Sequence, residues 1–168
     1  MDLFILRHGE AGKRIASGDK DSERPLTVAG QKEVADISKS LQDLGIKFDF
    51  IITSPLKRAH QTAAIVAKAF KNEKKIKDWT ELSPEGDRLE LYRKLSQFKE
   101  LSSVLVVGHE PYLSEIISEI ICDGKIGHIV LKKAGLAKIR IISSAAPKMQ
   151  GELRWLLTPR HMKNIAAK

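Results

Sequence analysis

Three short apolar segments constrain the architecture of this chain more than any other feature. They are "DLFILR" (2–7), "FDFIIT" (48–53) and "SVLVVG" (103–108), and each has the length and the branched or aromatic residues of a strand. Stretches with helically spaced apolar residues separate them. Buried strands that alternate with helices are typical of a mostly parallel sheet covered on both faces. The sequence therefore predicts an α/β three-layer sandwich.

The helices between these strands have recognisable ends. Thr27 is a suitable N-cap for the first helix, and Gly45 is a suitable residue to end it. We expect a second helix after Ser54–Pro55, a third over residues 88–99, and a fourth that carries Pro111 in its first turn.

The remaining segments complete a single-domain organisation. Residues 8–26 are polar and rich in turn formers, and a loop of that length in a compact domain favours a functional role. From residue 127 onward the pattern changes to short strands, "HIVLKK" (128–133), "GLAKIRII" (135–142) and "GELRWLL" (151–157), which we expect to pair antiparallel at one side of the sheet. With 168 residues and no repeat or linker, the sequence predicts one domain over 1–168, without a cap domain.

Composition narrows the classes of function. The net charge of +8 favours anionic partners in general, although the basic residues are scattered, and the one dense run, "KNEKKIK" (71–77), suits a solvated loop. No apolar run is long enough for a membrane span, and we find no signal peptide. The single cysteine, Cys122, excludes an internal disulfide and suits a small buried residue, so we expect a cytoplasmic protein without a membrane partner.

Cationic side chains follow all three apolar strands. The first strand runs into Arg7–His8–Gly9, the second is followed by Arg58 one helical turn later, and the third ends in Gly108–His109. Because ligands of open α/β sheets bind beyond the carboxyl ends of the strands, we expect these groups to meet at one edge. Arginine side chains and helix N-termini both favour an anion, and a phosphoryl group fits best.

The neighbouring positive charges assign different tasks to the two histidines. Cations disfavour imidazolium, so His8 should be neutral, with a ring nitrogen free to attack phosphorus. His109 would instead donate hydrogen bonds to the phosphoryl oxygens. Two neighbouring residues each allow two interpretations. Gly9 either lets the backbone approach the phosphate or is only a turn glycine, and Ser54 either caps its helix or contacts the phosphate.

The motifs at these strand ends resemble those of the histidine phosphatase superfamily, which includes the cofactor-dependent phosphoglycerate mutases. They are "LRHGE" (6–10), "SPLKRAHQTA" (54–63) and "VVGHEP" (106–111). "RPLTVAG" (24–30), "ELSPEGD" (81–87) and "GELRWLLTP" (151–159) are similar to the small, uncapped SixA-type phosphohistidine phosphatases. The resemblance implies a phospho-His8 intermediate, with Arg7, Arg58 and His109 on the phosphoryl group and neither a metal nor another cofactor. It also implies that the substrate is a phosphorylated protein whose phosphoryl group is on a histidine.

The chain departs from the wider family pattern in two places. Many members bind phosphate with an asparagine soon after the RHG triplet, but the first asparagine here is Asn72. Many members also have a glutamate proton donor in the region of "TELSPEGD". Glu81 is the candidate here, ahead of Glu85 and Asp87, although SixA-type enzymes are thought to manage without a dedicated acid and Glu81 is then structural.

Two alternative functions remain at this point. One is a phosphomonoesterase that acts on small phosphate esters; a mutase is disfavoured because little length remains for a substrate-enclosing cap. The other is a basic nucleic-acid-binding module without catalysis. An aromatic content of only 5% and the lack of a recognised binding motif disfavour it, so we expect no nucleic-acid partner.

Overall fold

A six-stranded mixed sheet forms the centre of the computed structural model, which describes residues 1–13, 21–122, 127–144 and 148–166. The strand order is β3-β2-β4-β1-β5-β6. Strands β1 (Asp2–Arg7), β2 (Phe50–Thr53), β3 (Ile76–Asp78) and β4 (Ser103–Gly108) run parallel. Strands β5 (Leu136–Ser143) and β6 (Gln150–Leu157) are antiparallel to their neighbours.

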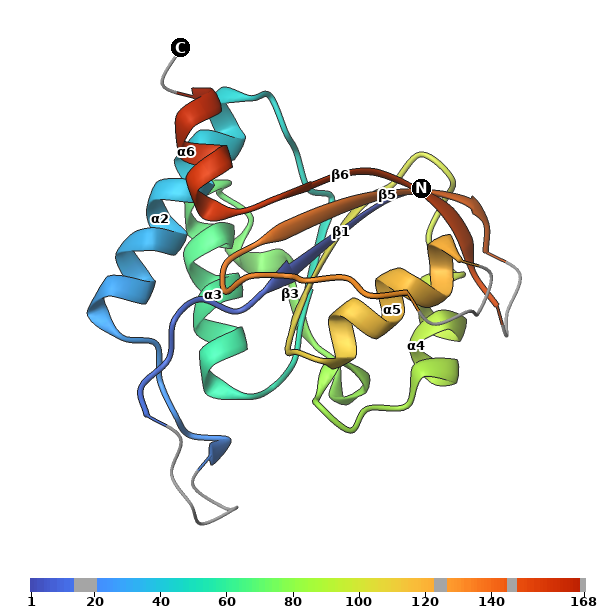
Figure 1. Cartoon of the computed structure of the whole chain (residues 1–168), viewed down its shortest axis with the longest axis horizontal. Coiled ribbons are helices and arrows are strands. Elements are labelled where there is room, and N and C mark those ends of the chain that lie inside the picture. Colours follow the sequence, from blue (N-terminus) through green and yellow to red (C-terminus); the bar gives the residue numbers. More distant parts are fainter. Residues whose placement is uncertain (14–20, 123–126, 145–147, 167–168) are drawn as a thin grey trace.

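Helices cover both faces of this sheet (Figure 1). Helices α2 (Val28–Asp43), α3 (Lys57–Ala69) and α6 (Pro159–Ala166) lie on one face, and α4 (Arg88–Leu95) and α5 (Tyr112–Ile121) lie on the other. Two 3₁₀ turns, η1 (Glu73–Lys75) and η2 (Thr80–Leu82), flank β3. The predicted three-layer α/β fold is thereby confirmed.

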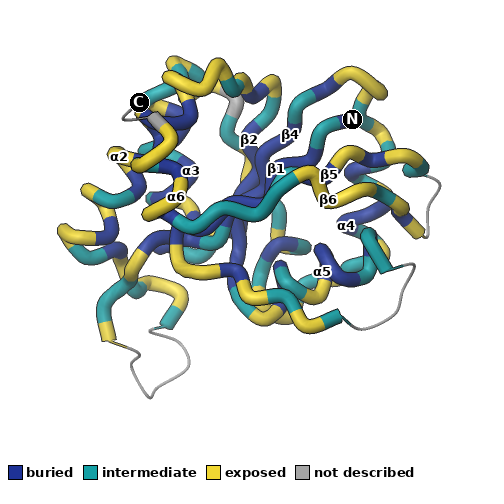
Figure 2. The backbone as a smooth tube through the Cα atoms, turned by 45° about the horizontal axis from the view of Figure 1, so that its top comes forward, coloured by how far each residue is buried: buried dark blue, intermediate teal, exposed yellow. Residues whose placement is uncertain are grey.

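Strand β1 shows how the sequence builds both halves of the core. Successive side chains of a strand point to opposite faces, so Leu3 and Ile5 pack toward α4 and α5, while Phe4 and Leu6 pack toward α2 and α3. All four are nearly fully buried, and the central strands are the most buried part of the chain (Figure 2). Burial of each such side chain contributes about 1.5–3 kcal/mol, which fixes the strand whose end carries the candidate site.

The ends of α2 follow the sequence closely. The Thr27 side chain accepts a hydrogen bond from the Gly30 N–H and caps the helix. At the other end Gly45 adopts a positive φ of 71°, and the N–H groups of Gly45 and Ile46 reach back to the carbonyls of Gln42 and Leu41. These two bonds form a Schellman motif, which glycine permits because it has no Cβ.

Several predicted boundaries were wrong. Residues 128–133 form no strand, because β5 occupies the position beside β1 where this segment would pair. The predicted helix over 88–99 ends at Leu95. The basic run 71–77 is not all loop, because it contains η1 and the start of the edge strand β3. Helix α6 was not predicted.

Two further sequence predictions stay untested. No helix of the described residues is both long enough and apolar enough to span a bilayer, and the cytoplasmic location stays a prediction. Residues 14–20 of the predicted loop lie outside the described residues.

Candidate active site

The carboxyl ends of β1, β2 and β4 meet at one edge of the sheet. The His8 N–H donates to the Gly108 carbonyl oxygen at 3.1 Å, and the Ser54 N–H donates to the Val107 carbonyl oxygen at 2.9 Å. This register brings the ring centroids of His8 and His109 to 5.2 Å, with the rings tilted by 54°. The structure therefore brings together the strand-end groups on which the sequence analysis rests.

The ring of His8 is held in one orientation. Its Nδ1 lies 2.7 Å from the Gly9 carbonyl oxygen, and because a carbonyl only accepts, Nδ1 carries the proton. A neutral ring then has its lone pair on Nε2, which makes no hydrogen bond to any described residue. Burial and the charges of Arg58 and Arg7, opposed by the Gly9 hydrogen bond, lower the pKa of His8 to about 4. His8 is thus a neutral imidazole with a free Nε2 at pH 7.

His109 is oriented by a fully buried serine. The His109 Nε2 lies 2.9 Å from Ser54 Oγ, and that oxygen also accepts the Leu56 N–H at 3.3 Å. A hydroxyl has two lone pairs and one proton, so Ser54 Oγ can accept the Leu56 N–H and donate to Nε2; in that tautomer a neutral His109 carries its proton on Nδ1. Burial, and next the charge of Arg58, lower the pKa of His109 to about 3. Ser54 thus orients the second histidine; it is not the N-cap of α3, which is Leu56, and its predicted contact with the phosphate stays a prediction.

Three arginines surround the two imidazoles. Arg7 donates through Nη1 to the Leu131 carbonyl oxygen at 2.9 Å, and Arg58 is almost completely buried. The third is Arg24, whose positive charge also lowers the pKa of both histidines. Sequence reasoning placed Arg24 only in the polar loop before α2 and gave it no contact with the phosphoryl group, although the motif "RPLTVAG" that begins with it was noted.

One carboxylate links two of these arginines. Asp21 pairs with Arg58 Nη2 at 3.2 Å and with Arg24 Nε at 3.0 Å, and its backbone carbonyl accepts from Arg58 Nη1 at 2.8 Å. Asp21 thereby fixes guanidinium groups whose like charges would otherwise drive them apart. No signal in the sequence identified it.

A buried threonine connects the nucleophile's strand to α3. The Thr62 hydroxyl accepts the Gly9 N–H at 3.1 Å and donates to the Arg58 carbonyl oxygen at 2.7 Å. The N–H of Gly9 is therefore not available to a phosphate. A Cβ at Gly9 would lie 2.7 Å from Val34 Cγ2, so glycine is needed here for close packing against α2.

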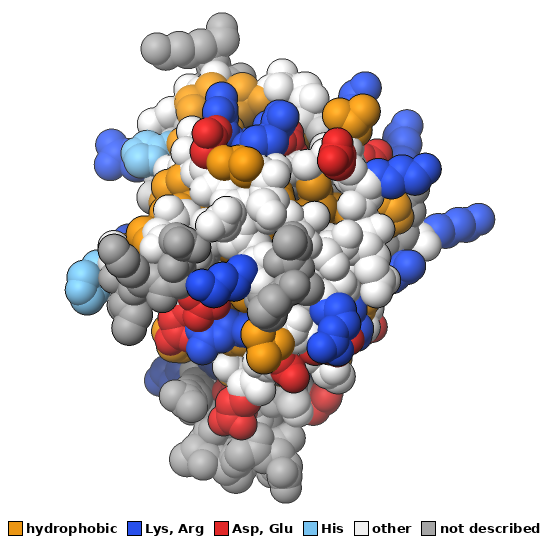
Figure 3. Space-filling model, turned by 90° about the vertical axis from the view of Figure 1, so that its right-hand side faces the viewer, with side chains coloured by type: hydrophobic (Ala, Val, Ile, Leu, Met, Phe, Trp, Pro, Cys, Tyr) orange, Lys and Arg blue, Asp and Glu red, His pale blue; other side chains and the backbone are white. Residues whose placement is uncertain are grey.

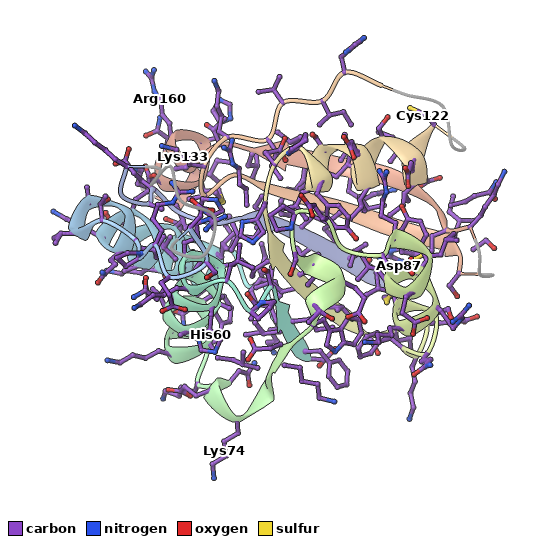
Figure 4. All side chains as sticks on the ribbon, turned by 90° about the horizontal axis from the view of Figure 1, so that it is seen from below. His60, Lys74, Asp87, Cys122, Lys133 and Arg160 are labelled. Carbon is purple, nitrogen blue, oxygen red and sulfur yellow. The ribbon has the colours of Figure 1, made fainter. Side chains whose placement is uncertain are left out.

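Two of the three candidate proton donors have other partners. Glu81 lies 2.6 Å from Lys94 Nζ; burial raises the pKa of its carboxyl, but Lys94 outweighs burial and the pKa lies below its usual value. Asp87 caps α4 by accepting the N–H groups of Leu89 and Glu90, and Figure 4 shows it at the α4 end of the molecule. Glu85 makes no ion pair with the described residues. The geometry thus gives the proton-donor prediction no support.

Two of the buried nitrogen atoms at this site, a guanidinium nitrogen and a ring nitrogen, have no hydrogen-bond partner among the described residues. They are Arg7 Nε and His109 Nδ1. Buried donors are nearly always satisfied in folded proteins, so an orphaned pair beside a cluster of positive charge marks a place for an anion. No group of three His, Cys, Asp or Glu side chains in the described part of the chain is arranged to hold a metal ion.

Comparisons with known proteins agree with this geometry. The profile of the histidine phosphatase superfamily (branch 1) matches residues 3–84. A phosphohistidine phosphatase SixA homolog from Haemophilus influenzae is 36% identical over 129 residues, which cover 71% of this chain and 77% of the relative. An uncharacterized protein from Picosynechococcus is 36% identical over 167 residues, or 95% and 98% of the two chains. The protein histidine phosphatase SixA complexed with tungstate has a similar structure, with a TM-score of 0.83 and 27% identity over 97% of this chain and 100% of that one.

Proposed function

Because this chain belongs to the histidine phosphatase superfamily, we propose that it removes the phosphoryl group of a phosphohistidine on a protein, through an intermediate on His8. The observation that carries the proposal is the pairing of a neutral His8, whose Nε2 is free, with the orphaned buried donors of Arg7 and His109. One group attacks phosphorus, and the others hold the oxygens on which negative charge accumulates.

In the first step, the Nε2 lone pair of His8 forms a bond to phosphorus. The phosphorus–nitrogen bond of the substrate breaks, and its electron pair returns to the departing imidazole, which takes a proton from solvent or leaves already protonated. The Gly9 carbonyl supports this step because its hydrogen bond from Nδ1 stabilises the positive charge that develops on the attacking ring. Arg7, Arg58 and the Nδ1–H of His109 stabilise the phosphoryl oxygens.

In the second step, a water oxygen attacks phosphorus on the opposite side from His8. The bond between phosphorus and Nε2 breaks, its electrons return to the ring, and one proton of the water goes to solvent. Inorganic phosphate leaves and His8 is again neutral. Because its pKa lies near 4, the released ring does not take up a proton at pH 7.

The ion pair of Glu81 favours a substrate with a nitrogen leaving group. An alkoxide leaving group needs an acid, but Glu81 is paired with Lys94 and held in the charged form. An imidazole leaves without such help when it is already protonated. The relative from Haemophilus influenzae is itself named as a phosphohistidine phosphatase homolog. We further propose that Arg24 joins Arg7 and Arg58 in binding the phosphoryl group, and that neither a metal nor another cofactor takes part.

The test compares substrates and histidine variants. We expect the wild-type chain to hydrolyse a phosphohistidine protein with at least about tenfold higher kcat/KM than small phosphate esters, because discrimination between substrates is a difference in transition-state binding. His8→Ala should lose at least about 10³-fold of this activity, and rapid quench should trap acid-labile phosphate on His8 of the wild type.

The matched control is His60→Ala, which removes an exposed histidine of α3 that lies 3.8 Å from Asp78. It should retain full activity. Unchanged hydrolysis in His8→Ala would refute the chemistry. Preference for a small ester, with phosphate still trapped on His8, would refute the protein substrate alone and favour the small-molecule phosphomonoesterase.

A further inference from the structure

We call Arg7, His8, Arg24, Arg58 and His109 the catalytic cluster. A groove of about 660 Å³ lies outside this cluster, along the β3 edge of the sheet on the α4 face. It extends from the amino ends of β2 and β4, at Asp49 and Ser102, to Trp79 just beyond β3. None of its lining residues belongs to the proposed reaction. Its volume is within the range of small-molecule binding pockets, about 300–1,000 Å³.

The apolar wall of this groove consists of three aromatic rings. Phe98 packs against Phe50 with the ring centroids 4.7 Å apart, and it stacks on Trp79 with an interplanar angle of 26°. All three rings are only partly buried, so the cluster keeps apolar surface in contact with solvent. Partly exposed aromatic surface in a concavity favours a planar apolar ligand.

Three lysines supply the charge of the groove. Lys77 and Lys99 are exposed and make no ion pair with the described residues. The third, Lys94, lies 5.1 Å above the Trp79 ring and is shared with Glu81. Asp49 is the one acidic residue of the lining, against three lysines, and its carboxylate accepts the Ser103 N–H at 2.9 Å. The groove is therefore net positive, and its free cations face an apolar wall.

The lining of the groove differs from a surface on which charged and apolar side chains are mixed. Over the face shown in Figure 3, lysine and arginine side chains are interspersed with acidic and hydrophobic ones. In the groove, two unpaired ammonium groups and one shared one flank a continuous aromatic wall. Single exposed lysines are common on a protein surface and need no ligand to explain them. Three lysines beside an aromatic groove of ligand size are not explained in this way.

We propose that this groove is a second binding site, which takes a small aromatic anion: a planar ring against Phe98 and Trp79, with its negative group held between Lys77, Lys94 and Lys99. Neither half of the ligand suffices alone. The ring gains apolar contact, and the lysines add attraction that weakens with salt. This inference does not depend on the proposed phosphatase reaction.

The chain contains a built-in reporter for this site. It has only two tryptophans, and Trp155 packs with Phe4 on the other face of the sheet. Trp155→Phe therefore leaves Trp79 as the only indole. AMP serves as the probe, and His8→Ala in the same chain prevents its hydrolysis. We expect saturable quenching of Trp79 fluorescence by AMP, and at least about fivefold less quenching by adenosine or by inorganic phosphate at equal concentration.

Lysine variants locate the binding. Lys77→Ala and Lys99→Ala should each weaken AMP binding by about threefold to fivefold, which is the scale of one exposed charge contact. The matched control Lys68→Ala, an exposed lysine of α3, should leave it unchanged. Arg58→Ala, which weakens anion binding at the catalytic cluster, should also leave the quenching unchanged.

Three outcomes would overturn the proposal. They are the absence of saturable quenching, quenching by inorganic phosphate equal to that by AMP, and quenching that disappears in Arg58→Ala but persists in the two lysine variants. The last outcome would place the nucleotide at the catalytic cluster. Since the readout is binding and not turnover, failure of the phosphatase reaction would leave this test intact.

Discussion

The pH dependence of catalysis tests the electrostatic reasoning at His8 most directly. His8 attacks only in its neutral form, so protonation below its pKa removes activity. Burial is the largest cause that lowers this pKa, and the charges of Arg58, Arg7 and Arg24 add to it. Because the shift is downward, the acid limb of kcat/KM should extend to lower pH than an ordinary histidine allows.

The size of the effect follows from the two pKa values. At pH 5.5, a histidine with the usual pKa of about 6.5 is about 9% neutral, whereas His8, with a pKa of about 4, is about 97% neutral. The wild-type chain should therefore keep about tenfold more activity at pH 5.5 than an unperturbed nucleophile would. His109 stays neutral over the same range because its pKa lies at about 3.

The assay measures kcat/KM from pH 8 to pH 4 with a substrate whose own ionisation is known and divided out. Arg58→Gln should move the acid limb upward, but not as far as 6.5, because burial of the ring persists. The matched control is Arg160→Gln; this exposed arginine of α6 points away from the molecule in Figure 4, and the limb should not move. An acid limb near pH 6.5 in the wild type would refute the reasoning.

Three further substitutions, one of them with a matched control, probe the structure around the site. Ser54→Ala removes the hydroxyl that sets the tautomer of His109, so kcat/KM should fall about tenfold and ¹⁵N NMR should show a mixed tautomer; an unchanged spectrum would contradict this role. A Cβ at Gly30 would lie 2.2 Å from a backbone carbonyl oxygen, so Gly30→Ala should lower the free energy of unfolding by about 1–3 kcal/mol in denaturant titrations. The control Gly12→Ala, with open space around it, should lower it by less than about 0.5 kcal/mol. Glu81→Gln should change kcat on p-nitrophenyl phosphate by less than about threefold. If kcat instead falls about a hundredfold and the decrease of activity at high pH disappears from the pH profile, Glu81 is the proton donor.

The layers of the fold were predictable because each depends on local pattern. Strand β4 spans 103–108, the same residues as the predicted strand, and Thr27 and Gly45 bound α2 as expected. The wrongly predicted strand has an identifiable cause. Residues 128–133 have the composition of a strand, but whether a segment pairs depends on which partner occupies the neighbouring position, and a sequence pattern contains no such information.

In the catalytic cluster, too, some residues could be predicted from the sequence and others could not. Groups at the ends of parallel strands converge by topology, so His8 and His109 could be placed together before any coordinates were known. Asp21 and Thr62 contact Arg58, and Arg24 joins the cluster through its ion pair with Asp21; the sequence pattern did not single out these contacts. Their type was visible in the sequence, but their partners were not.

The charges of the cluster explain why the nucleophile and its supports form one unit. Arg7, Arg24 and Arg58 repel one another, and the single carboxylate of Asp21 compensates only part of their charge. Burial is the main reason why both rings are neutral, and the arginine charges add to it, because a protonated His8 or His109 would add a fourth or fifth positive charge. The excess positive charge thus has two consequences at once: it helps burial to keep the Nε2 lone pair available, and it makes the negatively charged group that Nε2 attacks the most favourable occupant of the cluster.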